Sequence, residues 1–185
     1  GKMFAFEHAG IIPDVVVLSK AIGGSLPLAV VVYRAWLDTW LPGAHAGTFR
    51  GNQMAMAAGS AVMRYLKQHN VAAHATAMGE RLSEHLHILQ RDFPQLGDIR
   101  GRGLMLGVEL VDPNGSPDAL GHPPAFARLA PLVQRECLKR GLILELGGRQ
   151  GSVVRFLPPL IITASEIDQV AAIFGNAMAA AITRL

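Results

Sequence analysis

Short runs of apolar residues alternate with amphipathic segments along this chain of 185 residues. The first run, residues 15–18, holds three valines and a leucine and predicts a strand buried on both faces, as in a parallel sheet. A second short strand is expected within residues 26–33. The two runs lie too close in sequence for the crossover that a parallel pair requires. They should therefore be antiparallel or lie far apart in the sheet.

Apolar positions at helical spacing predict helices further along the chain. The first begins after Asn52, a favourable N-cap residue, and its apolar positions are Met54, Ala57, Ala58, Ala61, Val62 and Tyr65. The second covers residues 71–91, with a buried stripe of Met78, Leu82, Leu86 and Leu89. A third is expected over residues 126–137, with Gly141 as its stop. The last follows Thr163-Ala164-Ser165-Glu166, which fits a capping box.

Strands are predicted between these helices, over residues 103–111, 142–146 and 153–162. A loop rich in proline and glycine, residues 112–124, separates the first of these strands from the third helix. The natural domain boundary lies near residue 70. The tail of an α/β domain is expected before it, and a compact α+β unit after it.

Composition narrows the classes of protein. Half of the residues are hydrophobic, yet no apolar run reaches the roughly 18 residues of a membrane span. No signal peptide is recognised, and Gly1-Lys2-Met3 resembles the interior of a longer chain. Cys137 is the only cysteine, so it excludes an intramolecular disulfide and fits a reducing cytoplasm; an inert buried thiol is expected. The net charge of +3 comes from scattered residues, which disfavours nucleic-acid binding and is compatible with anionic small substrates.

Lys20 follows the first apolar run after a single serine and precedes the pair Gly23-Gly24. Open α/β sheets bind their ligands at this end of a strand. Partial burial there would lower the pKa of the lysine amine and favour a Schiff base with a carbonyl compound, including pyridoxal phosphate. Taken alone, these residues are better explained by a strand-end lysine whose amine reaches solvent.

Three segments decide between these interpretations, because together they resemble the class III aminotransferases, fold-type I enzymes that use pyridoxal phosphate. They are residues 12–24 around Lys20, residues 45–53 with the sequence His-Ala-Gly-Thr-Phe-Arg-Gly-Asn-Gln, and residues 154–160 with Val-Arg-Phe-Leu-Pro-Pro-Leu. The similarity runs through essentially the whole chain. It implies an α/β fold in which residues 1–70 are the C-terminal part of the large cofactor domain and residues 71–185 the small C-terminal α+β domain.

The resemblance also implies roles for three residues. Lys20 would hold pyridoxal 5'-phosphate as a Schiff base and carry a proton during the reaction. Thr48 would hydrogen-bond the cofactor phosphate, usually in the partner subunit of a homodimer with shared active sites; it also fits a simple turn residue before Asn52. Arg155 would hold the α-carboxylate of glutamate or 2-oxoglutarate through a planar fork. Considered alone, an arginine in an apolar strand is better explained by a structural carboxylate partner.

The segment Thr48-Phe49-Arg50-Gly51-Asn52 departs from the form common in the family and is similar to that of its diaminobutyrate:2-oxoglutarate members. This implies amino transfer between L-2,4-diaminobutanoate and 2-oxoglutarate. Ornithine, acetylornithine or another ω-amine remains an alternative donor, and a non-catalytic role in folding or dimerisation remains an alternative function. No metal site is expected, since the histidines are dispersed. The family's ring-nitrogen aspartate and phosphate loop would precede residue 1, so the 185 residues alone are expected to be inactive.

Overall fold

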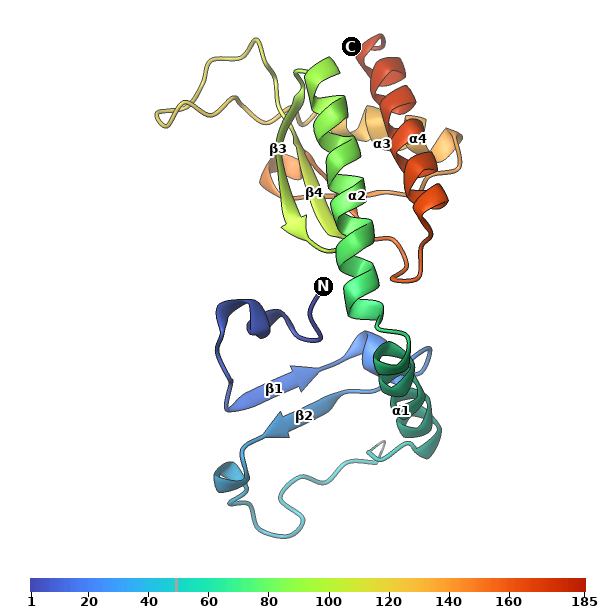
Figure 1. The fold of residues 1–185 in the computed structure, drawn as a ribbon. Helices are drawn as coiled ribbons and strands as arrows, with labels where there is room; N and C mark the ends of the chain where they lie inside the picture. Colours follow the sequence, from blue (N-terminus) through green and yellow to red (C-terminus); the bar gives the residue numbers. More distant parts are fainter. Residues whose placement is uncertain (49) are drawn as a thin grey trace. The chain divides into compact units, whose positions relative to one another are not determined.

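A computed structural model describes residues 1–48 and 50–185 of the chain, which divides into two compact units. The first unit is Lys2–Ala72, and the second is Ala73–Leu185 together with Gly1. Both units combine helices with strands, so the predicted mixture of α and β structure is confirmed (Figure 1). Phe49, which belongs to the segment compared above, lies outside the described residues. Within the described part, no helix has both the length and the apolar character that crossing a membrane requires.

The first unit contains a two-stranded ribbon and one long helix. Strands β1 (Val15–Leu18) and β2 (Val30–Tyr33) are antiparallel, as expected, with Val15 opposite Tyr33 and Leu18 opposite Val30. Helix α1 (Gln53–Gln68) follows later in the chain (Figure 1). Short 3₁₀ turns complete the unit: η1 (Ala5–Ala9), η2 (Lys20–Gly23) and η3 (Ala35–Leu37).

The predicted burial of β1 on both faces is wrong. Val15 is 48% exposed and Val17 is 68% exposed. Within the described residues β1 has only β2 as a ladder partner, so both strands are edges. Strands become buried on both faces when further layers cover the two sides of a sheet. The apolar composition of residues 15–18 therefore predicted burial, but the described residues do not cover β1.

Helix α1 begins as predicted but buries a different face. The Asn52 side chain accepts a hydrogen bond from the Ala55 backbone N–H at 3.1 Å, which confirms the N-cap. Its fully buried positions are Ala55 and Gly59, whereas Met54 is 72% exposed and Tyr65 lies on the surface. The helix thus packs through its smallest residues, because they allow its backbone to come close to a neighbouring segment. The pattern of large apolar residues could not reveal this.

The second unit contains a four-stranded antiparallel sheet in the order β3-β4-β6-β5. Its strands are β3 (Leu96–Arg102), β4 (Met105–Leu110), β5 (Glu145–Gly147) and β6 (Val153–Phe156). Three overlap predicted strands: β4 and β6 are shorter than predicted, and β5 begins and ends later than the predicted residues 142–146. Strand β6 ends before Pro158-Pro159, since proline donates no backbone hydrogen bond to a ladder. Strand β3, an edge strand that pairs with β4, was not predicted. Its two glycines and its charged residues have low strand propensity.

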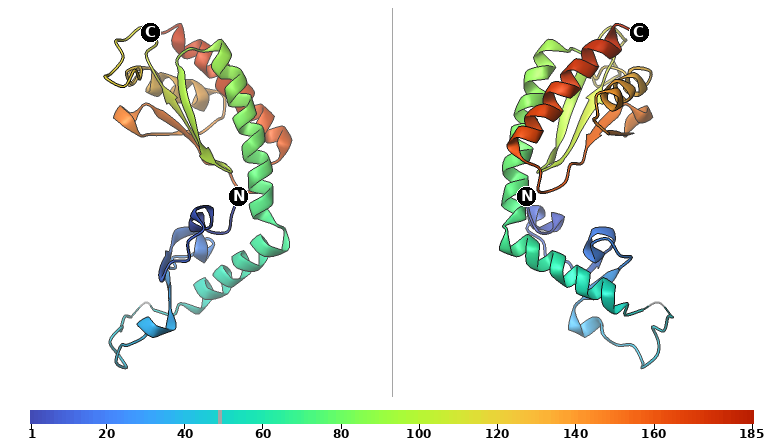
Figure 2. Two further views of the ribbon diagram at one scale, coloured as in Figure 1. Left: turned by 60° about the vertical axis from the view of Figure 1, so that its left-hand side comes forward. Right: turned by 90° about the vertical axis from the view of Figure 1, so that its right-hand side faces the viewer.

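Helices α2 (Val71–Asp92), α3 (Leu129–Lys139) and α4 (Ala164–Ile182) complete this unit. Figure 2 shows α2 and α4 on the same side of the sheet. The predicted stripe of α2 is confirmed, with Leu82 and Leu86 fully buried. The capping box of α4 is also confirmed: Thr163 Oγ1 accepts from Glu166 N–H, and the Glu166 carboxylate accepts from Thr163 N–H.

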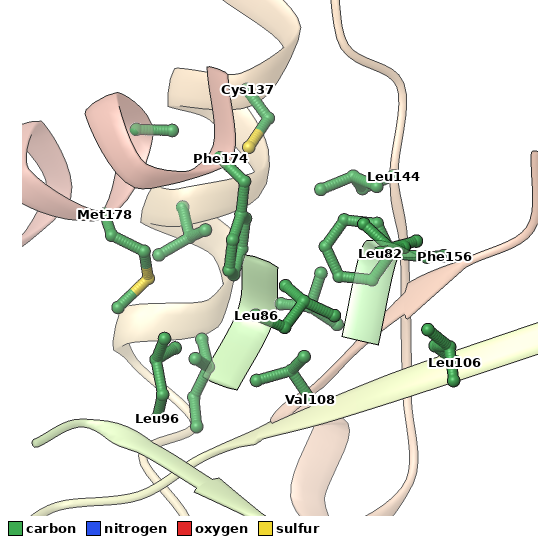
Figure 3. Packing of buried hydrophobic residues seen from close by; sticks show 14 of the residues in the cluster. Leu82, Leu86, Leu96, Leu106, Val108, Cys137, Leu144, Phe156, Phe174 and Met178 are labelled. Carbon is green, nitrogen blue, oxygen red and sulfur yellow. The ribbon is translucent and has the colours of Figure 1, made fainter. Parts of the chain in front are cut away.

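One hydrophobic core joins the three helices to the inner face of the sheet. Figure 3 shows Leu86 of α2 and Phe174 of α4 meeting Val108 of β4. Phe174 also packs edge-to-face on Phe156, with ring centroids 5.2 Å apart, a geometry worth about 0.5–1.5 kcal/mol beyond area burial. Cys137 lies in the same core, where burial raises the pKa of its thiol to about 12. The expectation of a buried thiol is therefore confirmed, and the raised pKa disfavours the reactive thiolate form.

Candidate functional site

The candidate lysine lies directly after β1. Ser19 separates the strand from Lys20, which opens the 3₁₀ turn η2. The φ angle of Lys20 is +56°, in the left-handed region that residues with a side chain rarely adopt. Such a conformation persists only where the surrounding structure imposes it, and it is found preferentially at functional sites. The φ angle of Lys20 therefore indicates that contacts with the surrounding structure hold the backbone in this conformation.

The side chain of Lys20 is exposed, so the partial burial expected from the sequence is not found. The physical reason is the one given for β1: the described residues supply no second layer over the strand end. A pocket of about 460 Å³ opens beside it, lined by Ser19, Lys20, Pro27, Leu28 and Ala29. The amine is accordingly accessible to a ligand in this pocket.

The glycine pair after Lys20 allows a tight turn. Gly23 is buried, and a Cβ atom at its position would lie 2.8 Å from the Cβ of Leu28. Gly24 has a φ of +64° and donates its N–H to the carbonyl of Ala21 at 3.1 Å. A side chain at either position would push the chain away from the pocket or strain the turn.

Thr48 lies in a separate, exposed turn of the same unit. The Arg50 N–H closes this turn by donating to the Gly47 carbonyl at 3.2 Å. Helix α1 begins at Gln53, shortly after it. A hydroxyl and backbone N–H groups close to a helix N-terminus suit an anion, and they equally suit a simple turn.

Arg155 lies on β6 in the second unit and points away from the core. Its sequence neighbours Val154 and Phe156 are buried, and alternation along a strand directs Arg155 to the opposite face. Its Nη1 lies 3.0 Å from Oε2 of Glu145 on β5, with the arginine side chain 40% exposed and the glutamate 64%. The expected anionic partner is therefore present as a carboxylate within this chain.

Glu145 was missed as a site residue, although the sequence contained a usable signal. In the antiparallel pair of β5 and β6, Glu145 stands opposite Arg155, and Gly147 stands opposite Val153. These partners are equidistant from the turn at Gln150. Once the two strands are treated as one hairpin, the pairing of Glu145 with Arg155 follows from the register alone.

Glycines keep the surroundings of Arg155 open. Gly107 stands directly opposite it on β4, and a Cβ atom at Gly147 would lie 3.2 Å from the Arg155 Cδ. Arg155 also lines a pocket of about 380 Å³ whose other walls are mostly apolar, including Phe156 and Pro158. A guanidinium at such a place can bind the carboxylate of a small ligand in the bidentate manner.

Comparison with known proteins now identifies the family. The sequence profile described as "Aminotransferase class-III" matches residues 1–178. The chain belongs to the class III aminotransferases. The family resemblance inferred from the three segments is thereby confirmed. Members of this family depend on pyridoxal phosphate.

Two relatives in this family are particularly similar. A diaminobutyrate–2-oxoglutarate aminotransferase of Rhizobium meliloti is 57% identical over 185 residues, which is all of this chain and 38% of the relative. A protein of the same name from Haemophilus influenzae is 50% identical over 169 residues, 91% of this chain and 37% of the relative. The chain therefore spans well under half of the length of these relatives.

The fold is shared with solved structures of the family. A Bacillus anthracis aminotransferase superimposes with a TM-score of 0.84 at 28% sequence identity, covering 96% of this chain and 41% of that protein. The structure thus has the aminotransferase fold over nearly its whole length. The predicted fold class is confirmed.

Proposed function

We propose that the protein containing this chain transfers an amino group between L-2,4-diaminobutanoate and 2-oxoglutarate, with Lys20 as the residue that carries pyridoxal 5'-phosphate. The observation that supports this most is the lysine itself. It follows a strand, adopts a φ of +56° and presents an exposed amine beside a pocket. The 57% identity to a diaminobutyrate–2-oxoglutarate aminotransferase supports the choice of substrates.

The residues around Lys20 fit the aldehyde end of the cofactor. An exposed primary amine can form a Schiff base with an aldehyde, with loss of water, and a pocket of about 460 Å³ lies beside it. Bound pyridoxal phosphate supplies an electron sink for carbanion character on the substrate. The proposed task of Lys20 is to hold the cofactor and, once its Nζ is free, to accept and return a substrate proton. The proposed task of Thr48 is to donate a hydrogen bond from its hydroxyl to the cofactor phosphate.

Arg155 is proposed to bind the substrate carboxylate. Its pairing with Glu145 does not oppose this role, because an ion pair with both side chains substantially exposed contributes only about 0–1 kcal/mol. An incoming carboxylate can therefore displace Glu145. In the absence of substrate, the Glu145 carboxylate pairs with the guanidinium.

We further propose a cytoplasmic homodimer in which Thr48 serves the active site of the partner subunit. The single cysteine, buried with a raised thiol pKa, suits a reducing compartment. The exposed turn that holds Thr48 leaves its hydroxyl available to a second subunit.

Replacing Lys20 tests the central proposal. In the complete protein, Lys20→Ala should remove the visible absorbance of the Schiff base between the lysine and pyridoxal phosphate, and nearly all transamination, because no amine remains at the end of β1. Lys2→Ala is the control and should retain both. Retained Schiff-base absorbance in Lys20→Ala would show that another lysine holds the cofactor. Assaying the unaltered protein with diaminobutanoate, ornithine and acetylornithine separates the alternative donors.

A further inference from the structure

We propose that Gly59 of α1 is a positioning residue for Lys20: by bringing the helix into direct contact with the turn η2, it holds the lysine backbone in its left-handed conformation. This inference rests on the proposed role of Lys20. Gly59 does not touch the pocket beside Lys20 and is not among the residues that the family resemblance assigned.

The contact of Gly59 is with the backbone of the turn. Gly59 is buried in the middle of α1, and a Cβ atom at its position would lie 2.5 Å from the carbonyl oxygen of Ile22. The same atom would lie 3.1 Å from Cδ2 of Leu28. Packing this close excludes every side chain larger than hydrogen unless the turn or the helix moves.

Residues next to Gly59 in α1 also contact the turn. A Cβ atom at Gly24 would lie 3.5 Å from Val62 Cγ2 and 3.7 Å from Ala58 Cβ, which are ordinary contact distances to residues on either side of Gly59 in α1. Ala55, one turn earlier, is fully buried. Gly59, with Ala58 and Val62 beside it, therefore forms the part of α1 that lies against the turn containing Lys20.

A displacement at Ile22 should reach Lys20, because both belong to η2. The turn is tied internally, with Gly24 N–H donating to Ala21 and Leu26 N–H donating to Gly23, each at 3.1 Å. Leu28, the second group that Gly59 would disturb, lines the same pocket as Lys20. A residue with the positive φ of Lys20 depends on its surroundings to hold that conformation, and these contacts surround it.

Helix formation offers no explanation for this glycine. Glycine weakens the interior of a helix relative to alanine, because it has more backbone freedom to lose. Helix propensity alone would make Gly59→Ala favourable. The substitution therefore separates the contact with the turn from the stability of α1.

The test compares Gly59→Ala with Ser60→Ala, an exposed neighbour on the same helix, in the complete protein. Two quantities are measured: the apparent Kd for pyridoxal phosphate from its visible absorbance, and the acylation rate of Lys20 in cofactor-free protein by peptide mapping. Gly59→Ala should raise the Kd about tenfold or more and change the acylation rate, since misplacing a reactive group by a fraction of an ångström is costly. Ser60→Ala should change neither, and the helical circular dichroism of both should match that of the unaltered protein.

A double variant shows which contact matters. Adding Leu28→Val to Gly59→Ala shortens the side chain at 3.1 Å but leaves the carbonyl of Ile22 in place. The cofactor affinity should stay low. Full recovery of cofactor affinity in the double variant would assign the effect to Leu28 and overturn the inference. An unchanged Kd in Gly59→Ala would also overturn it. So would a loss of the helical signal and folded state of Gly59→Ala. The Lys20→Ala variant keeps the two proposals distinct, because retained Schiff-base absorbance there defeats the proposed role of Lys20 itself.

Discussion

At the scale of single residues, two glutamates show how exposure decides what an ion pair can do. The Glu136 side chain is 4% exposed and lies within 2.9 Å of Lys139, Arg140 and Arg184. Glu145 is 64% exposed and pairs with Arg155. Separating the buried carboxylate from its partners would leave a charge without compensation, whereas water replaces the partner of the exposed one. Glu145 is thus suited to be displaced and Glu136 is not.

Removing the charge of Glu145 should strengthen carboxylate binding at Arg155. In Glu145→Gln the substrate no longer competes with an internal anion, so the KM for 2-oxoglutarate should fall about two- to fivefold, the range expected for an exposed pair. Steady-state kinetics at constant ionic strength measures this, and kcat should change little. Arg155→Lys should raise the same KM, because lysine lacks the planar fork.

The control for this pair is Asp98→Asn, which removes an exposed partner of Arg100 at 2.7 Å on β3, the far edge of the same sheet. Its KM for 2-oxoglutarate should equal that of the unaltered protein. An unchanged or higher KM in Glu145→Gln would show that the glutamate supports Arg155 rather than competes for it.

At the scale of elements, α3 and α4 are joined by charges as well as by the core. Glu136 and the two cations that follow it belong to the end of α3, and Arg184 lies just beyond α4. Hydrogen bonds from Lys139 and Arg140 lower the pKa of the Glu136 carboxyl to about 2. A carboxyl with a depressed pKa stabilises the folded state at neutral pH, and this contribution disappears as pH falls from its ordinary pKa of 4.5 towards 2.

The Glu136 cluster therefore predicts a pH-dependent difference in stability. Glu136→Gln should have a lower Tm than the unaltered protein at pH 7, because three cations lose their shared anion. The difference between the two Tm values should shrink steadily below pH 5, as protonation removes the same charge from the unaltered protein. Thermal denaturation followed by circular dichroism between pH 3 and pH 7 provides the measurement.

Glu80→Gln, on the exposed face of α2, is the matched control for loss of one negative charge. It should leave the Tm nearly unchanged at each pH. A Tm difference for Glu136→Gln that stays constant from pH 7 to pH 3 would mean that shape or packing, not charge, accounts for the effect.

At the scale of the whole molecule, the candidate residues are divided between two compact units. Lys20 and Thr48 belong to Lys2–Ala72, and Arg155 belongs to the unit that contains the four-stranded sheet. The chain spans 38% of its Rhizobium meliloti relative, so the proposed reaction is assigned to the whole protein. Exposed valines on β1 and β2 are apolar surface that associating partners commonly cover.

The proposed sharing of active sites can be tested with mixed dimers. One subunit carries Lys20→Ala and the other Thr48→Ala, with different affinity tags to isolate the heterodimer. If Thr48 serves the partner's site, both changes fall in one site and the other stays intact, giving about half of the normal activity per dimer. The two homodimeric variants are the controls and should both be impaired. A heterodimer with no more activity than the average of the two homodimers would place Thr48 in its own subunit's site.

The sequence by itself determined the family, the order of most elements and their local chemistry. Three short segments were sufficient to recognise a class III aminotransferase, and the Asn52 cap and the Thr163–Glu166 capping box depend on neighbours within one helical turn. The stripe of α2 followed from spacing alone, because large apolar side chains on one face of a helix must be buried somewhere. The edge strand β3 was not predicted from the sequence, since its glycines and charged residues have little strand propensity.

Tertiary structure decided the exposure of β1, the buried face of α1 and the close packing of α1 on the turn η2. Each depends on which segment lies opposite, and hydrophobic periodicity does not contain that information. Gly59 is the clearest instance. Its sequence position predicts only a residue of weak helix propensity. The structure explains why it is glycine, because an added Cβ atom would lie 2.5 Å from the Ile22 carbonyl oxygen. Close approach between backbones is a property of two segments together, so no single segment could have predicted it.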